Sequence, residues 1–330
     1  MNAPTPLVLS EPARLQPEAD AAAVETNHDV VDDYVYLIGR PTLRAFLSFV
    51  KTRTRHGHRA DAGALTDEWR AAAALIGKLE KTEAGWADGA AVEPLPAHLE
   101  SLQEPFLRSP LVQHCFNTVP TQLGMVELDR LVVYQHHIDL SYVRSLKEKL
   151  GPAPTQEDIF RLCLPSEQPR PPVNWARSHR DTYIFSSPSN DLRFLGAMPL
   201  ESGNVSGYPP PGALVGVVGL AVGFGSNFLS IIGASDRLIL HNGSHRAFAL
   251  RELGVTHAPC IVQHVYSREE LNVVAASAVT ERPEVFTKTP RPPLLKDYFD
   301  PNLRKIVPVI RRLRQVTVKF QVDEAYVPAL

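Results

Sequence analysis

Cysteine is scarce in this chain, with Cys115, Cys163 and Cys260 as its only thiols among 330 residues. No two of them are spaced as CxxC, so they cannot build a disulfide framework or a cysteine-rich zinc site. An HExxH motif is absent as well, and we predict no metal held by the protein itself. These absences favour a reducing, cytoplasmic environment.

A large net charge is also lacking. The chain has 34 basic and 36 acidic residues, which leave a formal charge of −2. Such a balance gives no whole-molecule field that would recruit nucleic acid or an anionic membrane. Any attraction of that kind has to come from a local cluster.

Hydrophobic segments that would target or anchor the chain are not evident. Residues 1–30 have no basic segment leading into an apolar one, which argues against a signal peptide and for a disordered tail. Residues 208–235 carry no charge and are long enough to span a membrane. Glycines dilute their hydrophobicity, and the polar pair Ser226-Asn227 interrupts it, so we predict buried strands with glycine-permitted turns and no membrane contact.

Proline is abundant, with 29 residues, and this predicts long irregular connections between elements. Helical periodicity follows Pro41 and recurs over Thr66–Lys81. We predict an α+β chain of four parts. They are a disordered tail (1–30), a helical N-terminal region (31–115), a domain at 116–270 interrupted by an irregular, proline-rich insertion (151–212), and a proline-rich connection with a basic C-terminal helix (271–330).

One stretch predicts a strand, a tight turn, a helix and a second strand in succession. The first strand is Arg237–His241, the helix ends at Gly254, and Val255–Val265 follows as a strand. A strand that turns at a glycine directly into a helix leaves unpaired N–H groups at the helix start, where an anion binds. Gly243 permits close approach, and Ser244, His245 and Arg246 add donors and positive charge; Asn242-Gly243 could instead be a plain turn with Ser244 as an ordinary cap.

A second stretch, Glu127–Gln135, precedes it; Met125–Val133 predicts a strand, and a helix to Leu150 follows. Together the two resemble the ParB/sulfiredoxin-like nucleotide-binding superfamily (the ParB N-terminal-like domain), of which this chain would be a divergent member with a long insertion. The resemblance implies a mixed sheet with helices, a nucleotide whose phosphates bind the Gly243–Arg246 turn, and Gln135–His137 across the pocket.

Several residues differ from the sequence pattern of that family, and these differences limit the reactions that the chain could catalyse. Ser244 stands where sulfiredoxins have their catalytic cysteine, and a hydroxyl without an activating base is a poor substitute for a thiolate, so sulfiredoxin activity is not expected. Gln135, His136 and His137 replace the glutamate of the serine-kinase members. No helix-turn-helix pattern of the chromosome-partition members follows Val265.

We therefore expect a cytoplasmic nucleotide-binding protein that takes ATP or CTP, with Mg²⁺ brought in by the phosphates. NTP hydrolysis or phosphoryl transfer is the chemistry open to it, with His245 or His136 moving a proton. The predicted nucleotide-binding residues are Gln135, Asn242, Gly243, Ser244, His245 and Arg246.

A basic strip near the C-terminus supports an alternative function. No acidic residue occurs between 304 and 319, and a helix docked through Ile306, Ile310 and Leu313 would present the strip to DNA or to an acidic protein. The alternative is thus a DNA-associated, ParB-like regulator with nucleotide as a switch; the acidic run at 29–33 is a candidate intramolecular partner. Phe320 is the only adjacent aromatic residue, so base stacking is not predicted. The strip consists of Arg304, Lys305, Arg311, Arg312 and Arg314.

Overall fold

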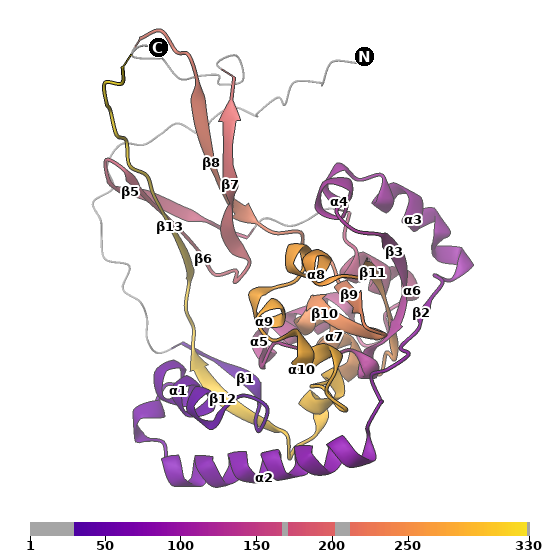
Figure 1. The fold of residues 1–330 in the computed structure, drawn as a ribbon. Helices are drawn as coiled ribbons and strands as arrows, with labels where there is room; N and C mark the ends of the chain where they lie inside the picture. The colour runs from indigo at the N-terminus through magenta and orange to yellow at the C-terminus, as the bar shows by residue number, and fades with distance from the viewer. Residues whose placement is uncertain (1–29, 167–170, 202–211, 329–330) are drawn as a thin grey trace.

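A computed structural model describes residues 30–166, 171–201 and 212–328. Within these ranges the chain is α+β and forms four β-sheets (Figure 1). The disordered tail predicted for residues 1–30 lies outside the described residues, apart from Val30.

The central sheet has the strand order β10-β9-β11-β3-β2. Strand β11 runs parallel to β9 and antiparallel to β3, and helix α7 connects β10 to β11. The buried side chains of Phe248 and Ile261 belong to the core between this helix and the sheet. The strand, turn, helix and strand predicted from the sequence are confirmed as β10 (Arg237–Asn242), α7 (Ser244–Glu252) and β11 (His257–Val265), beside β9 (Ser230–Ala234), β3 (Thr121–Glu127) and β2 (Val92–Glu93).

A second sheet joins the two ends of the described chain. Strand β1 (Val31–Leu37) lies between β12 (Arg304–Ile310) and β4 (His137–Asp139) and is antiparallel to both. Helices α1 (Leu43–Arg53) and α2 (Ala62–Thr82) pack against it. The predicted N-terminal region therefore contains the two expected helices, but it also supplies a strand.

The basic C-terminal helix predicted for residues 304–319 is wrong, because this segment forms strands β12 and β13 (Arg314–Lys319). In β12 the buried side chains are Val307 and Val309, two residues apart as a strand requires. Ile306, expected to dock the helix, is 54% exposed.

The predicted irregular insertion is mostly ordered secondary structure. After α5 (Leu140–Leu150) and α6 (Gln156–Cys163), the chain leaves the body and forms two small sheets, β13-β6-β5 and β7-β8, which we call the arm. Figure 1 shows the arm lying apart from the helices and central sheet. Its strands, besides β13, are β5 (Asn174–His179), β6 (Thr182–Ser187), β7 (Leu192–Leu200) and β8 (Val217–Phe224).

Within the described part of the uncharged segment 208–235, strands β8 and β9 are separated by an irregular link at 225–229. Strand β9 is buried as expected, whereas β8 is partly exposed. No helix within the described ranges is long and apolar enough to cross a membrane.

Short helices and turns complete the body, and one of these turns follows Glu127, where the strand predicted over Met125–Val133 ends. The proline-rich segment after α10 is anchored by Arg291, whose buried guanidinium pairs with Asp297 and, at 3.0 Å, with Glu83 at the end of α2. The helices are α3 (Glu100–Leu107), α4 (Pro110–Cys115), α8 (Arg268–Val274), α9 (Ser277–Thr280) and α10 (Pro283–Thr287), and the 3₁₀ turns are η1 (Gly57–Arg59), η2 (Ala97–Leu99), η3 (Leu128–Arg130) and η5 (Leu295–Phe299).

Candidate functional site

The start of helix α7 is the centre of the candidate site. Gly243 has φ 95°, and a Cβ there would come within 2.6 Å of Leu229 Cδ1, so this turn requires glycine. The first helical hydrogen bond runs from the Ala247 N–H to the Gly243 carbonyl at 2.9 Å. The N–H groups of Ser244, His245 and Arg246 therefore precede the hydrogen-bonded part of the helix.

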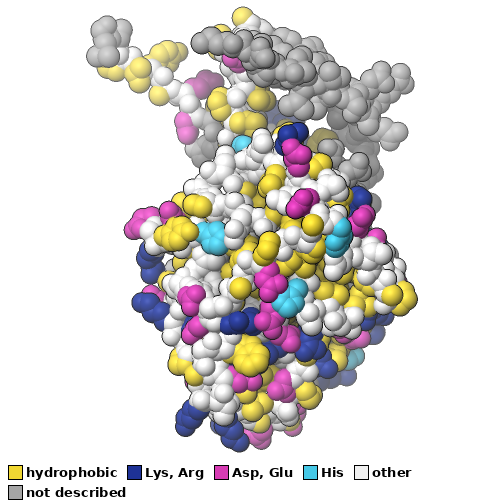
Figure 2. Space-filling view, turned by 90° about the vertical axis from the view of Figure 1, so that its right-hand side faces the viewer, with side chains coloured by type: hydrophobic (Ala, Val, Ile, Leu, Met, Phe, Trp, Pro, Cys, Tyr) yellow, Lys and Arg dark blue, Asp and Glu magenta, His cyan; other side chains and the backbone are white. Residues whose placement is uncertain are grey.

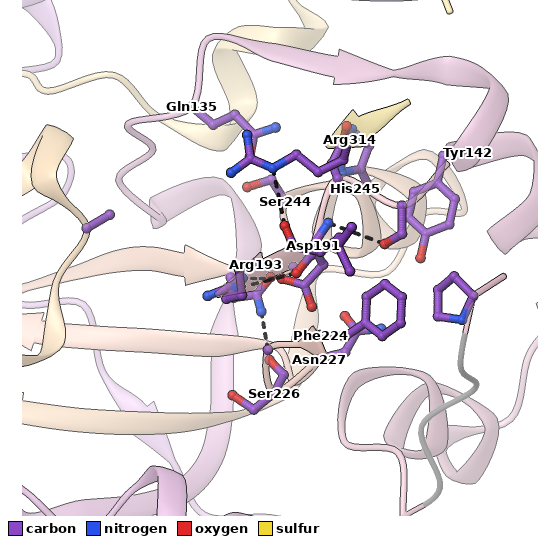
Figure 3. A pocket seen from close by; sticks show the side chains of 18 of the residues that line it. Gln135, Tyr142, Asp191, Arg193, Phe224, Ser226, Asn227, Ser244, His245 and Arg314 are labelled. Carbon is purple, nitrogen blue, oxygen red and sulfur yellow. Dashed lines mark hydrogen bonds and ion pairs between the residues drawn. The ribbon is translucent and has the colours of Figure 1, made fainter. Parts of the chain in front are cut away.

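This turn lines a cavity of about 2090 Å³. Figure 3 shows Ser244 and His245 of α7 among the side chains around it, together with Arg314 of β13. Ser244 is 7% exposed and lines the cavity, and its hydroxyl forms no hydrogen bond within the described parts of the chain. It is therefore an unused donor and acceptor beside the helix start.

Positive charge predominates around the cavity. Its acidic side chains are Asp139 and Asp191. Asp139 caps α5 by accepting from the Ser141 N–H at 2.8 Å, and Asp191 pairs with Arg193. An anion in the cavity would thus meet an excess of positive charge. The basic side chains are Arg53, Lys149, Arg193, Arg246, Arg312 and Arg314.

Arg246 has a different position from the one expected for a phosphate ligand. Its buried guanidinium donates to the backbone carbonyl groups of Asn227 at 2.7 Å and Cys163 at 3.2 Å, and to Asn227 Oδ1 at 3.0 Å. These bonds fix the end of α6 and the loop before β9. Arg246 brings charge and holds the cavity wall, and most of its donors are already occupied.

His245 also has its basic nitrogen engaged. Nε2 accepts a hydrogen bond from the Asp139 N–H at 3.0 Å, so the neutral ring carries its proton on Nδ1. Burial lowers the pKa of His245 to about 4, and the nearby His137 adds to the shift. A proton-accepting role through Nε2 would require this hydrogen bond to break.

Gln135 and His137 line the cavity, as the resemblance implied, but His136 does not. The Gln135 side chain donates to the His137 carbonyl at 2.9 Å. His136 Nδ1 is buried and has no hydrogen-bond partner among the described residues, and burial lowers its pKa. Asn242 donates to the Ser226 carbonyl at 2.9 Å and supports the turn from the side. Of the two predicted proton-transfer residues, the structure thus brings only His245 to the cavity.

The basic strip is dispersed, because β12, the link after it and β13 point its side chains in different directions. Arg311 forms an ion pair with Asp32 at 2.6 Å, which confirms an intramolecular partner in the acidic run. Lys305 pairs with Glu68 at 2.5 Å, whereas Arg312 and Arg314 line the cavity. The remaining donors bond backbone carbonyls: Arg304 with Tyr298, Arg312 with Thr52, and Arg314 with Leu192.

The surface of the body carries no broad patch of one charge sign on the face seen in Figure 2, where basic and acidic side chains are interspersed. Such a face offers no evident track for a DNA backbone.

Three basic residues of the cavity were not anticipated from the sequence. Arg53 ends α1, Lys149 lies in α5 and Arg193 in β7. They come from three regions far apart in the chain, and none belongs to a motif. Only the folded arrangement reveals them.

No group of three or more histidine, cysteine, aspartate or glutamate side chains suited to a metal occurs among the described residues. Comparison with models of known protein families, with curated proteins and with solved structures gives no match.

Proposed function

We propose that this chain binds a nucleoside triphosphate, with its phosphates at the start of α7. The observation that supports this proposal is the start of α7, where Ser244 is 7% exposed and its hydroxyl forms no hydrogen bond within the described residues, in a cavity with six basic and two acidic side chains. Phosphate oxygens would accept hydrogen bonds from these donors, and the surrounding positive charge would offset the negative charge of the phosphates.

The arrangement of the two sequence stretches agrees with this proposal. Gln135 and His137, at the start of β4, border the same cavity as the Gly243–Arg246 turn. This is the juxtaposition that the resemblance to the ParB/sulfiredoxin-like superfamily implies, and we propose that relationship for the residues around the cavity. ATP and CTP are the candidate ligands.

Magnesium would enter with the phosphates. Both carboxylates of the cavity already have partners, Asp139 in the cap of α5 and Asp191 with Arg193. Direct coordination by the protein is therefore not required, and Mg²⁺ commonly binds through phosphates and water.

We propose binding as the function in preference to hydrolysis or phosphoryl transfer, with the cytoplasm as its location. The proposed general base would need a free nitrogen, but His245 Nε2 is occupied by the Asp139 N–H, and His136 lies outside the cavity. A DNA-associated regulator draws its support from the basic strip, whose side chains are dispersed and partnered.

Isothermal titration calorimetry of the full chain with ATP, ADP, CTP and GTP, with and without Mg²⁺, tests the proposal. Ser244→Asp is the informative variant, since a carboxylate is compatible with a helix start but repels phosphate. We expect at least about tenfold weaker binding, which corresponds to about 1.4 kcal/mol. Ser267→Asp is the matched control, because Ser267 is the exposed N-cap of α8 and does not line this cavity.

Absence of binding for every nucleotide would contradict the proposal. Equal affinity of Ser244→Asp and wild type would place the ligand elsewhere in the molecule.

A further inference from the structure

The three-stranded sheet of the arm has one face rich in aromatic rings. In the antiparallel register, Trp175 of β5 lies opposite Phe185 of β6, which lies opposite Val316 of β13. Tyr183 belongs to the same face, because side chains two residues apart along a strand share a face. We call this surface the aromatic face; it comprises Trp175, Arg177, Tyr183, Phe185, Arg314, Val316, Val318 and Phe320.

The rings of this face form two nearly parallel pairs. Trp175 and Phe185 have ring centroids 6.4 Å apart with planes inclined by 24°, and Tyr183 and Phe320 have centroids 6.4 Å apart with planes inclined by 21°. Trp175 is 55% exposed and Phe320 40% exposed. Large aromatic surfaces exposed on a sheet indicate a binding surface.

Basic side chains accompany these rings. The Arg177 guanidinium carbon lies 5.7 Å from the centre of the Tyr183 ring. Arg314 shares the face and, with Trp175 and Phe185, also lines the cavity. Strands β5 to β7 lie within residues 174–200, and the link before β13 and β13 itself lie within 311–320. The acidic residues of these two ranges are Asp181 and Asp191. The basic ones are Arg177, Arg180, Arg193, Arg311, Arg312, Arg314 and Lys319.

We propose that the aromatic face binds single-stranded nucleic acid, with unpaired bases stacked on the rings and phosphates attracted by the arginines. A positively charged surface with exposed aromatic rings is what sequence-tolerant binding of unpaired strands requires. Base pairs in a duplex are already stacked and would leave the rings unused, so single strands are preferred.

A second copy of the chain fits this face less well. In a two-fold symmetric contact the same surface meets itself. Each face would then bring the positive charges of Arg177 and Arg314 and no acidic side chain to the contact, and burying two positively charged faces against each other is unfavourable. Nucleic acid supplies the complementary negative charge.

Fluorescence anisotropy with labelled oligo(dT) and oligo(rU) 20-mers that lack a terminal phosphate tests this proposal on the full chain. We expect binding that weakens with salt and exceeds binding to a duplex. Trp175→Ala should weaken binding between about 5-fold and about 100-fold, and Trp175→Phe should restore most of it. Arg177→Gln should reduce the salt slope by about one.

Tyr266→Ala is the matched control, since Tyr266 is 80% exposed and lies after β11, outside the arm. It should bind the oligonucleotides as the wild type does. Ser244→Asp should also retain this binding, so that a failure of the nucleotide proposal and a failure of this one can be told apart.

Several results would overturn the proposal. These are no binding of either oligonucleotide at low salt, equal binding of the duplex, or equal binding by Trp175→Ala. Light scattering that shows a dimer in the wild type and a monomer in Trp175→Ala would instead assign the face to contact between copies.

Discussion

The Nε2 atom of His245 accepts a hydrogen bond from the Asp139 N–H at 3.0 Å, and this bond joins the first turn of α7 to the cap of α5. The edge of Tyr142 packs against the same imidazole, with ring centroids 5.3 Å apart and planes inclined by 73°. The two stretches of the candidate site are therefore held together through a neutral histidine.

Acid should destabilise the protein through this histidine. Burial lowers the pKa of His245 to about 4 in the folded state, below its usual 6.5. The unfolded chain therefore binds a proton first, and stability falls as the pH drops from about 6.5 to about 4, by up to about 3 kcal/mol from this residue. Urea unfolding at a series of pH values measures the slope.

His245→Gln should reduce that slope, because an amide oxygen can still accept from the Asp139 N–H but does not titrate; His137, whose pKa burial also lowers to about 4, keeps its own contribution. His245→Leu leaves this N–H unpaired and should cost about 1–3 kcal/mol at pH 7. His98→Gln, on an exposed histidine, is the control. An unchanged slope in His245→Gln would contradict the assignment.

Substitution of Gly243 by alanine should be more costly than the same change at Gly254. Both glycines have positive φ, so both alanines adopt an unfavourable backbone conformation. Only at Gly243 would the new Cβ clash, at 2.6 Å from Leu229 Cδ1; at Gly254 it meets nothing within 4 Å. We expect about 1 kcal/mol at Gly254 and about 2–4 kcal/mol at Gly243 in thermal unfolding. An equal loss of stability in Gly243→Ala and Gly254→Ala would show that the turn can move away from Leu229.

Loss of the Arg311 side chain should destabilise the sheet formed by β12, β1 and β4. The hydrogen bond from Arg311 lowers the pKa of the buried Asp32 carboxyl below 3.8. Arg311→Gln should cost about 1–2 kcal/mol at pH 7, less than a fully buried pair because the guanidinium is more than half exposed.

Because the folded pKa of Asp32 is depressed, this contribution is present above about pH 4 and disappears as the carboxyl is protonated at lower pH. Urea unfolding of wild type and Arg311→Gln should thus converge on acidification. Arg70→Gln, which removes an exposed pair with Asp67, should have little effect at any pH. A constant difference across the pH range would contradict the ion-pair explanation.

Arg291 should be among the residues most sensitive to substitution. Its guanidinium and the Asp297 carboxylate are both buried, and Asp297 also accepts from the Leu294 N–H at 3.0 Å. Arg291→Met would leave a buried carboxylate without its counter-charge and should cost about 3–5 kcal/mol. Arg291→Lys keeps the charge but loses the bidentate contact. Its free energy of unfolding, measured by chemical denaturation, should therefore lie between those of the wild type and Arg291→Met. A loss below about 1 kcal/mol for Arg291→Met would show that Asp297 finds another partner.

The elements around α7 could be predicted from the sequence because their signals are local. Gly243 and Gly254 mark the two ends of the helix, and the flanking strands are continuous apolar runs. The cap of α5 is local as well, but the hydrogen bond between Asp139 and His245 joins residues 106 positions apart. No local pattern reports such a contact.

The C-terminal strands were mistaken for a helix because their apolar residues fit both periods. Ile306, Ile310 and Leu313 suit a helix, whereas Val307 and Val309 suit a strand. Whether this segment forms a helix or a strand depends on the strand it pairs with. That strand, β1, lies more than 260 residues earlier in the chain. Base stacking was likewise not predicted for the basic segment, since the rings beside Phe320 come from β5 and β6.

The pairing of β1 with β12 and of β6 with β13 has a consequence for the order of events during synthesis. Domains generally fold from the N-terminus while the chain is still emerging from the ribosome. Here β1 can pair along its full length with β12 only after Ile310 has emerged. Strand β6 can pair fully with β13 only after Lys319 has emerged. Until then β5 and β6 form a two-stranded hairpin, which is marginally stable alone. The arm, and with it the far wall of the cavity, can therefore take its final form only after Lys319 has been translated.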